Sequence, residues 1–349
     1  MKTKIGKELK VTGISLLSIL LALAFFLTGL CIYHKLMLRK EKSVIENTEG
    51  LMVEVDGNYM NLYMEGDGEK TLVFLAGAGT PSPMYDFKPL YTRLSDKYKI
   101  VVIERFGYGY SDECEGDRPL DLITDQDRQA LAEAGVDGPY ILVPHSLSGA
   151  EAIWWANHYP DEIEAIIGLD MNIPAQYDAY PVSLDDLEAQ DLEEAISSQD
   201  FYDFWMYDIG LVRLFNAEAL LPALTSDDLT EEEKEQYRAL TYVMYCRGSG
   251  ATWARESVMT EHALTAMQEY VNGPIPDVPT LMIVSDGTVM KPVYGDDCTE
   301  IWRSIHEDYV SRVTVGDIIE LDCGHYVHAE MPDQVAAGIE EFLDSLEQG

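Results

Sequence analysis

The chain shows two kinds of hydrophobic pattern, one near its start and another through the rest. Residues 11–33 form a single apolar run without a charged residue. Beyond residue 51, short apolar runs of strand length alternate with amphipathic stretches. The predicted strands are residues 71–75, 100–104, 140–143, 165–169, 280–284 and 317–321. Because continuously apolar strands are buried on both faces, the alternation predicts an α/β fold with a mostly parallel, doubly covered sheet.

Helices are predicted between these strands, and a hairpin before them. Residues 52–55 and 59–65 are predicted to pair across Asp56-Gly57, a favoured turn sequence. The predicted helices are residues 86–94, 122–134, 151–159, 299–309 and 333–346. From about residue 173 to 278 the alternation stops, and acidic helical stretches replace strands. We therefore expect a helical cap inserted into an α/β domain of residues 51–349.

Residues 11–33 are long enough to cross a membrane. At 1.5 Å per residue they span roughly 34 Å, against about 30 Å for the hydrocarbon core of a bilayer. A basic leader, residues 1–10, precedes them, but the run exceeds a signal peptide's hydrophobic region and no small-residue cleavage pattern follows. We expect an uncleaved single-pass anchor, then a linker over residues 34–50. Because both flanks are basic, only the short leader indicates orientation, with the catalytic domain extracytoplasmic.

The chain is strongly acidic, with 24 Lys and Arg against 62 Asp and Glu and a formal net charge of −38. Eight of the basic residues lie within residues 1–42, so the body is more acidic still. Such a body repels nucleic acid and anionic membrane surfaces. The acidic surface either keeps the protein soluble or binds a cationic partner. The five cysteines form no CxxC pair, hence neither a zinc pattern nor a disulfide framework, and no metal or cofactor is expected.

An aromatic cluster stands out within the predicted cap. Its members are Phe201, Tyr202, Phe204, Trp205 and Tyr207. Two interpretations fit this cluster. The side chains pack the cap onto the sheet, or they line a pocket for an apolar substrate.

Ser146 has the sequence context of a nucleophile on a sharp turn. It lies between a predicted strand and a predicted helix, within Pro144-His145-Ser146-Leu147-Ser148-Gly149. Such a turn needs small residues beside the nucleophile, because strand and helix nearly touch, and it lifts the hydroxyl above the sheet. The backbone N–H groups of Leu147 and of Ala78, which follows the strand 71–75, are candidate donors to an oxyanion.

A base and an acid are also available at strand ends. His325 follows the last predicted strand and can act as general base toward Ser146. His328 is interpreted as a packing residue, since no third ligand at suitable spacing supports a metal site. Asp170 ends the strand before the cap and Asp286 follows a later strand. Either can orient His325, and either also suits a turn.

Four motifs in this order resemble the α/β-hydrolase superfamily, in its group of lipases, esterases and aminopeptidases with a cap. They are Phe74-Leu75-Ala76-Gly77-Ala78-Gly79, Glu104-Arg105-Phe106-Gly107-Tyr108-Gly109-Tyr110-Ser111-Asp112, the turn at Ser146, and Gly324-His325 through Glu330-Met331-Pro332. The second is similar to the family's D-R-x-G-x-G-x-S-D loop. The resemblance covers residues 51–347 and implies a serine hydrolase that cleaves an ester, or an amide, of a small or lipid-like substrate through an acyl-enzyme.

The chain departs from the family pattern at three positions. Ala76 stands where the family has His, Pro144 replaces the first glycine of the turn, and Thr288 holds the usual acid position. Members such as haloalkane dehalogenases carry the acid after the strand before the cap, where Asp170 lies, and we favour Asp170. Dehalogenases and epoxide hydrolases need an aspartate nucleophile, so Ser146 argues against both chemistries. Two alternatives stay open, a proline-iminopeptidase-like peptidase and a non-catalytic membrane-anchored binding protein on the hydrolase scaffold.

Overall fold

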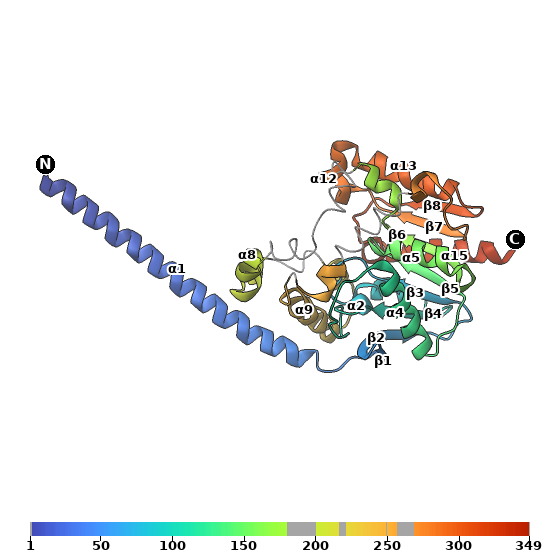
Figure 1. Ribbon diagram of the computed structural model, residues 1–349, viewed down its shortest axis with the longest axis horizontal. Helices are drawn as coiled ribbons and strands as arrows, with labels where there is room; N and C mark the ends of the chain where they lie inside the picture. The colour runs from blue at the N-terminus through green and yellow to red at the C-terminus, as the bar shows by residue number, and fades with distance from the viewer. Residues whose placement is uncertain (1, 180–199, 216–220, 249, 257–268, 349) are drawn as a thin grey trace.

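An eight-stranded sheet forms the centre of the structure, in the order β1-β2-β4-β3-β5-β6-β7-β8 (Figure 1). Its strands are β1 (Leu51–Val55), β2 (Asn58–Glu65), β3 (Thr71–Leu75), β4 (Lys99–Glu104), β5 (Tyr140–Pro144), β6 (Ile163–Leu169), β7 (Thr280–Val284) and β8 (Gly316–Glu320). β2 pairs antiparallel with β1 and β4, and all other neighbours are parallel. The predictions of a mostly parallel sheet and an edge hairpin are confirmed.

The structure is a computed structural model that describes residues 2–179, 200–215, 221–248, 250–256 and 269–348. Met1 of the predicted leader and parts of the predicted cap lie outside the described residues. Within 173–278, the described residues form helices and turns and contain no strand. The longest of these helices is α9 (Glu231–Tyr245), which begins with a capping box between Thr230 and Glu233.

Helices cover both faces of the sheet, because its strands are apolar on both sides. In β3, Val73 and Leu75 join one buried core, and Leu72 and Phe74 join the other. The first core is covered by α4 (Leu120–Glu133), α5 (Ser148–His158) and α13 (Cys298–Ser311). The second is covered by α3 (Lys88–Tyr91), α9 and α15 (Pro332–Gln348). A buried core on each face holds the parallel strands in place. The candidate residues lie at the ends of these strands.

The predicted helix 86–94 differs from the observed structure. Two short helices, α2 (Pro83–Asp86) and α3, occupy this region. Pro89 has no N–H with which to continue the hydrogen-bond ladder of a single helix, so the chain turns between them.

The N-terminal helix α1 (Lys2–Val44) extends well beyond the predicted span of residues 11–33. Its part from Gly13 to Val44 is long and apolar enough to cross a membrane, and the most apolar stretch of this part is largely exposed. A signal sequence meets the same criteria of length and composition. Most of the predicted linker 34–50 is therefore helical, because its apolar stripe packs against α9 instead of remaining free.

Candidate active site

A sharp turn joins β5 to α5 and carries Ser146. The backbone of Ser146 is in the left-handed region, with φ of 54°, which is strained for a residue other than glycine. The Ser148 hydroxyl donates to Leu75 O at 2.7 Å, and His145 N donates to the same oxygen at 2.9 Å. These bonds tie the turn to β3. A Cβ added at Gly149 would lie 2.2 Å from the backbone of Asn172, so this turn needs glycine where the helix begins.

Asp170 lies at the end of β6 and is fully buried. Its carboxylate accepts hydrogen bonds from Ser285 N, Ser285 Oγ and Trp302 Nε1, each at 2.8 Å. It also meets His325 Nδ1 at 2.6 Å. Burial alone would raise the pKa of Asp170, but these bonds, led by that of His325, outweigh it and lower the pKa. Asp170 is therefore a fixed carboxylate.

His325 lies on the loop after β8, beside the turn that carries Ser146. Its main-chain oxygen is 3.2 Å from His145 Nε2, and the rings of His325 and His145 are 4.7 Å apart. On the other side, Ser146 N donates to Leu169 O at 3.4 Å, next to Asp170. Among the described residues no hydrogen bond joins Ser146 Oγ to His325, and such bonds are often long before substrate binds. The structure thus brings Ser146, Asp170 and His325 to neighbouring strand ends.

Asp286, the alternative acid, faces a different partner. Its Oδ1 accepts from Thr288 N at 2.9 Å and from Thr288 Oγ1 at 2.7 Å, as in a local Asx turn. The residue that reaches the buried site from β7 is its neighbour Ser285, which binds Asp170. Of the two predicted acids, Asp170 is the one in contact with His325.

The two predicted oxyanion donors come from two different loops. Ala78 is exposed in the loop after β3, and Leu147 follows Ser146. Within the described part of the chain, neither backbone N–H donates to a protein acceptor. A Cβ added at Gly77 would lie 2.9 Å from Ser146 Cβ, so glycine permits the loop to approach the turn. Tyr245 of α9 holds this loop from above by donating to Gly79 O at 2.8 Å.

The sequence did not reveal three residues that shape this site. Ser285 and Trp302 orient Asp170, and His145 packs over the His325 ring. Burial, with His325 and His328 nearby, lowers the pKa of His145 well below its usual value, so this ring remains neutral and donates from Nε2. Of these three residues, only Ser285 had a sequence signal, since a serine at the end of a strand can bind a carboxylate at the end of the neighbouring strand. Trp302 looks like any apolar position of an amphipathic helix.

The second histidine of the C-terminal loop is structural. His328 Nε2 binds Asp86 Oδ2 at 2.8 Å, and Tyr237 of α9 donates to Asp86 Oδ1 at 2.7 Å. All three residues are buried, so they fasten α9 over the strand ends. No group of three or more His, Cys, Asp or Glu residues suited to a metal ion occurs in the described ranges.

Behind the turn lies a buried cluster of charged residues. Arg105 pairs with Glu151 and, at 2.8 Å, with Glu256, and it donates to Ala76 O at 2.7 Å. Glu151 belongs to the first turn of α5, and Ala76 begins the loop that carries Ala78. Arg105 therefore links the helix behind the turn to the candidate oxyanion loop. Its removal would leave two buried carboxylates unpaired, which is strongly destabilising.

Asp127 of α4 is a fully buried carboxyl beside this cluster. Burial and the charge of Glu151 raise the pKa of Asp127 well above its usual range. The unfolded chain releases this proton above about pH 3.9, so the stability of the wild-type chain declines as pH rises from there toward the raised pKa. We expect Asp127→Asn, which needs no proton, to gain in Tm relative to wild type between pH 4 and pH 8. Thermal unfolding across this range measures the difference, and parallel Tm curves would contradict the expectation.

The sheet order, the sharp turn after β5 and the cap define an α/β hydrolase. The model of the alpha/beta hydrolase family matches residues 72–338, and the chain belongs to this family. The Bacillus subtilis protein YbdG is 34% identical over 353 residues, covering 98% of this chain and 99% of its own. A haloalkane dehalogenase of Mycolicibacterium smegmatis is 22% identical over 85% of this chain and 91% of its own. The structure of a haloalkane dehalogenase loop variant from Bradyrhizobium elkanii matches with a TM-score of 0.56, at 19% identity, over 85% of this chain and 97% of its own.

Proposed function

We propose that this hydrolase is a serine hydrolase that cleaves a carboxylic ester, or less readily an amide, through an acyl-enzyme. The observation that carries the proposal is the 2.6 Å contact between His325 and the buried Asp170 carboxylate, beside a strained serine. Relatives named as haloalkane dehalogenase and epoxide hydrolase share the fold. We do not propose their reactions, because the turn carries Ser146 where an aspartate nucleophile is needed.

The proposed mechanism assigns one role to each strand end. Ser146 Oγ attacks the carbonyl carbon while His325 Nε2 accepts its proton, and the same nitrogen returns the proton to the leaving group. Asp170 holds Nδ1 protonated and stabilises the imidazolium. The N–H groups of Ala78 and Leu147 stabilise the oxyanion. Water, activated by His325, then attacks the acyl-enzyme and releases the acid.

We further propose the membrane arrangement that the sequence predicts. Residues 11–33 form an uncleaved single-pass anchor, and residues 51–349 form an extracytoplasmic hydrolase domain with a cap at about 173–278. The long apolar stretch of α1 supports this arrangement. Its substrates are then small or lipid-like acyl compounds at the outer surface.

A fluorophosphonate probe tests the proposed nucleophile. We expect the folded full-length chain to be labelled once, on the peptide that contains Ser146, and the heat-unfolded chain to remain unlabelled. Peptide mapping by mass spectrometry gives the position. A folded chain without label would favour the binding-protein alternative.

Comparing two substrates separates an esterase from the peptidase alternative. An aryl ester and an aminoacyl amide with a free α-amine are offered to the same preparation. We expect a higher kcat/KM for the ester. A higher kcat/KM for the amide would favour an iminopeptidase-like peptidase, in which the acidic cap attracts the free amine of the substrate.

A further inference from the structure

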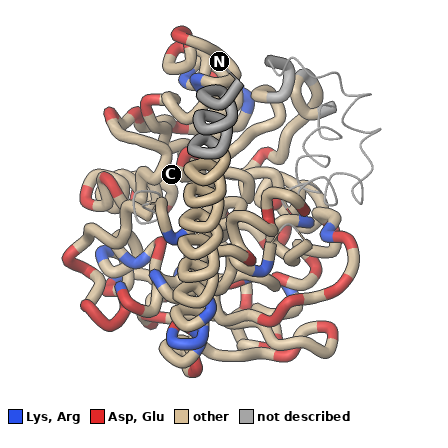
Figure 2. The backbone as a smooth tube through the Cα atoms, turned by 90° about the vertical axis from the view of Figure 1, so that its left-hand side faces the viewer, with Lys and Arg blue, Asp and Glu red and all other residues tan. Residues whose placement is uncertain are grey.

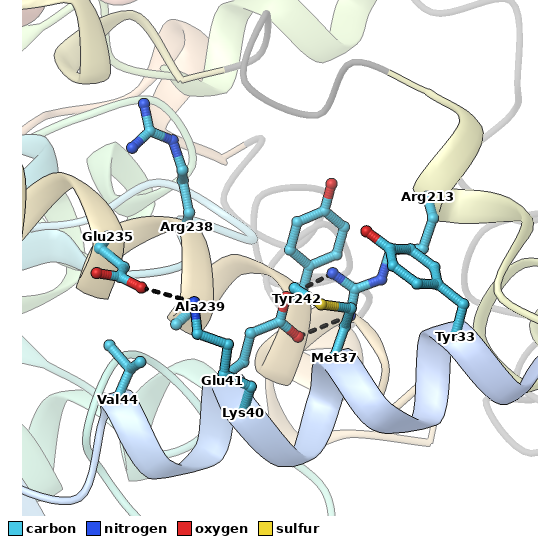
Figure 3. Close-up of a pocket in the computed structure, with 10 residues that line it drawn as sticks. All are labelled: Tyr33, Met37, Lys40, Glu41, Val44, Arg213, Glu235, Arg238, Ala239 and Tyr242. Carbon is cyan, nitrogen blue, oxygen red and sulfur yellow. Dashed lines mark hydrogen bonds and ion pairs between the residues drawn. The ribbon is translucent and has the colours of Figure 1, made fainter.

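The C-terminal half of α1 is docked on the cap. One stripe of the helix is wholly or partly covered, and its members are Leu27, Leu30, Cys31, His34, Met37, Leu38, Glu41 and Val44. Glu41 forms a bidentate ion pair with Arg213. Arg213 also donates to His34 Nδ1 at 3.0 Å, and its guanidinium lies 3.8 Å from the centre of the Tyr242 ring. A cavity of about 270 Å³ lies along this contact, between α1 and α9 (Figure 3). The helix is therefore attached to the cap and does not act as a free tether.

This docking brings the candidate active site close to α1. One side of α9 contacts α1, and Tyr245 at the end of α9 binds the loop that carries Ala78. A helix with its side chains is about 10–12 Å thick. α9 thus lies between the candidate site and the C-terminal end of α1, just beyond the apolar run 11–33.

The aromatic cluster of the cap lies beside α1 and is largely exposed. Phe201 is 77% exposed, Tyr202 50% and Phe204 47%, and Phe215, which follows the cluster in the chain, is 62% exposed. The segment joins α1 where Cys31 Sγ donates to Asp208 O at 3.6 Å. Figure 1 shows α8 (Asp200–Asp203) near the C-terminal half of α1, farther toward the N-terminus of that helix than α9. The sequence offered packing or a substrate pocket for these side chains. Trp205 and Tyr207 are partly buried and contact the other rings, as packing predicts, whereas the exposure of the three remaining members fits neither interpretation.

The position of the Cys31–Asp208 contact along α1 indicates what the exposed aromatic side chains contact. Cys31 lies near the end of the apolar run 11–33, so the cluster stands where that run would leave the hydrocarbon core. Tyr and Trp are enriched at this depth in membrane proteins, and Phe and Leu form the buried face of segments that lie in the interface. Just beyond it, α1 carries Lys35, Arg39, Lys40 and Lys42, and Figure 2 shows basic residues at the lower end of the helix. Cations there suit lipid phosphates, although the body is acidic.

We propose that Phe201, Tyr202, Phe204, Leu214 and Phe215 form a second membrane-contact surface, which inserts into the headgroup layer of the bilayer that α1 spans. This surface is called the aromatic shoulder below. Together, α1 and the shoulder fix the cap side of the hydrolase against the lipid. If the proposed ester hydrolysis holds, this placement selects acyl substrates that reside in the bilayer, since they reach the site without crossing water.

A tryptophan placed in the shoulder tests the contact without reference to catalysis. Phe201→Trp and the control Tyr59→Trp each replace an exposed aromatic residue, and Tyr59 lies on β2, outside the cap. Both full-length variants are reconstituted in vesicles of phosphatidylcholine and phosphatidylglycerol, with and without bromine near the top of the acyl chains. We expect the added emission of Phe201→Trp to be quenched by bromolipid and that of Tyr59→Trp to be unaffected. Equal quenching, or none in either, would overturn the proposal.

A substrate comparison tests the consequence. The triple variant Phe201→Ser/Phe204→Ser/Phe215→Ser keeps every residue of the candidate site. We expect its kcat/KM to fall by about tenfold or more on a long-chain ester in vesicles, because burial of one large aromatic side chain already corresponds to that factor. Its rate on a short soluble ester should be unchanged. Equal rates on both esters, relative to wild type, would contradict bilayer delivery. If wild type cleaves neither ester, the hydrolase proposal fails, while the quenching result still decides the shoulder.

Discussion

Replacing Ser146 by alanine is expected to lower kcat for ester hydrolysis by about 10⁵-fold or more, because a triad without its nucleophile retains only binding and oxyanion stabilisation. Alanine keeps the size that the tight turn allows, and it tolerates the φ of 54° no worse than serine does. The loss is therefore expected in the chemistry and not in the fold. The measurement is steady-state hydrolysis of a soluble aryl ester together with fluorophosphonate labelling.

Ser148 provides the matched control within the same turn. Its hydroxyl is buried and donates to Leu75 O, so Ser148→Ala removes a structural bond worth about 1 kcal/mol and no reacting atom. We expect Ser148→Ala to lower Tm while still reacting with the probe. If Ser146→Ala kept wild-type hydrolysis, or if labelling were lost only in Ser148→Ala, the assigned nucleophile would be wrong.

Asp170→Asn is expected to lower kcat by on the order of 10⁴-fold, the effect of holding a catalytic histidine in the wrong tautomer. The asparagine oxygen still accepts from Ser285 N and Trp302 Nε1, and asparagine adopts the positive φ of this position readily. Its amide then donates toward His325 Nδ1, which forces the proton to Nε2. A ring protonated there cannot accept the proton of Ser146.

Asp286→Asn is the control for this acid. Asp286 caps its own turn with Thr288, and asparagine makes the same bonds, so we expect less than about a threefold change in kcat. Hydrolysis rates of the two variants, each checked for an unchanged melting transition, give the comparison. A larger loss from Asp286→Asn than from Asp170→Asn would reverse the assignment.

The fold was largely predictable because its strands are short, continuously apolar runs that alternate with amphipathic stretches. This alternation is typical of a parallel sheet covered on both faces. Thr71–Leu75 and Thr280–Val284 have the predicted bounds, β8 is shifted by one residue, and the other strands differ by one or two residues at one end. The helix at 86–94 was wrong because one proline outweighs an amphipathic pattern. The length of α1 was underestimated for a different reason. Its last eleven residues are helical and docked through partners in the cap, which periodicity near the N-terminus does not reveal.

Local sequence patterns did not distinguish the two candidate acids, because those around Asp170 and Asp286 are alike, and only the family resemblance favoured Asp170. Both follow a buried strand and both suit a turn. What separates them is the indole of Trp302 and the hydroxyl of Ser285, which reach Asp170 from 132 and 115 residues away. These contacts depend on the order of β6 and β7 in the sheet and on the packing of α13. Such information belongs to the tertiary structure alone.

The ion pair between Glu41 and Arg213 joins positions 172 residues apart, and this separation affects how the chain matures. During synthesis the helix that bears Glu41 emerges long before Arg213 exists. Until then its carboxylate remains hydrated, because burying a charge without a partner is costly. The cap supplies the partner of Glu41 only when most of the chain has been made. The pair thus forms only after Arg213 has been made, and it then joins the N-terminal helix to the cap.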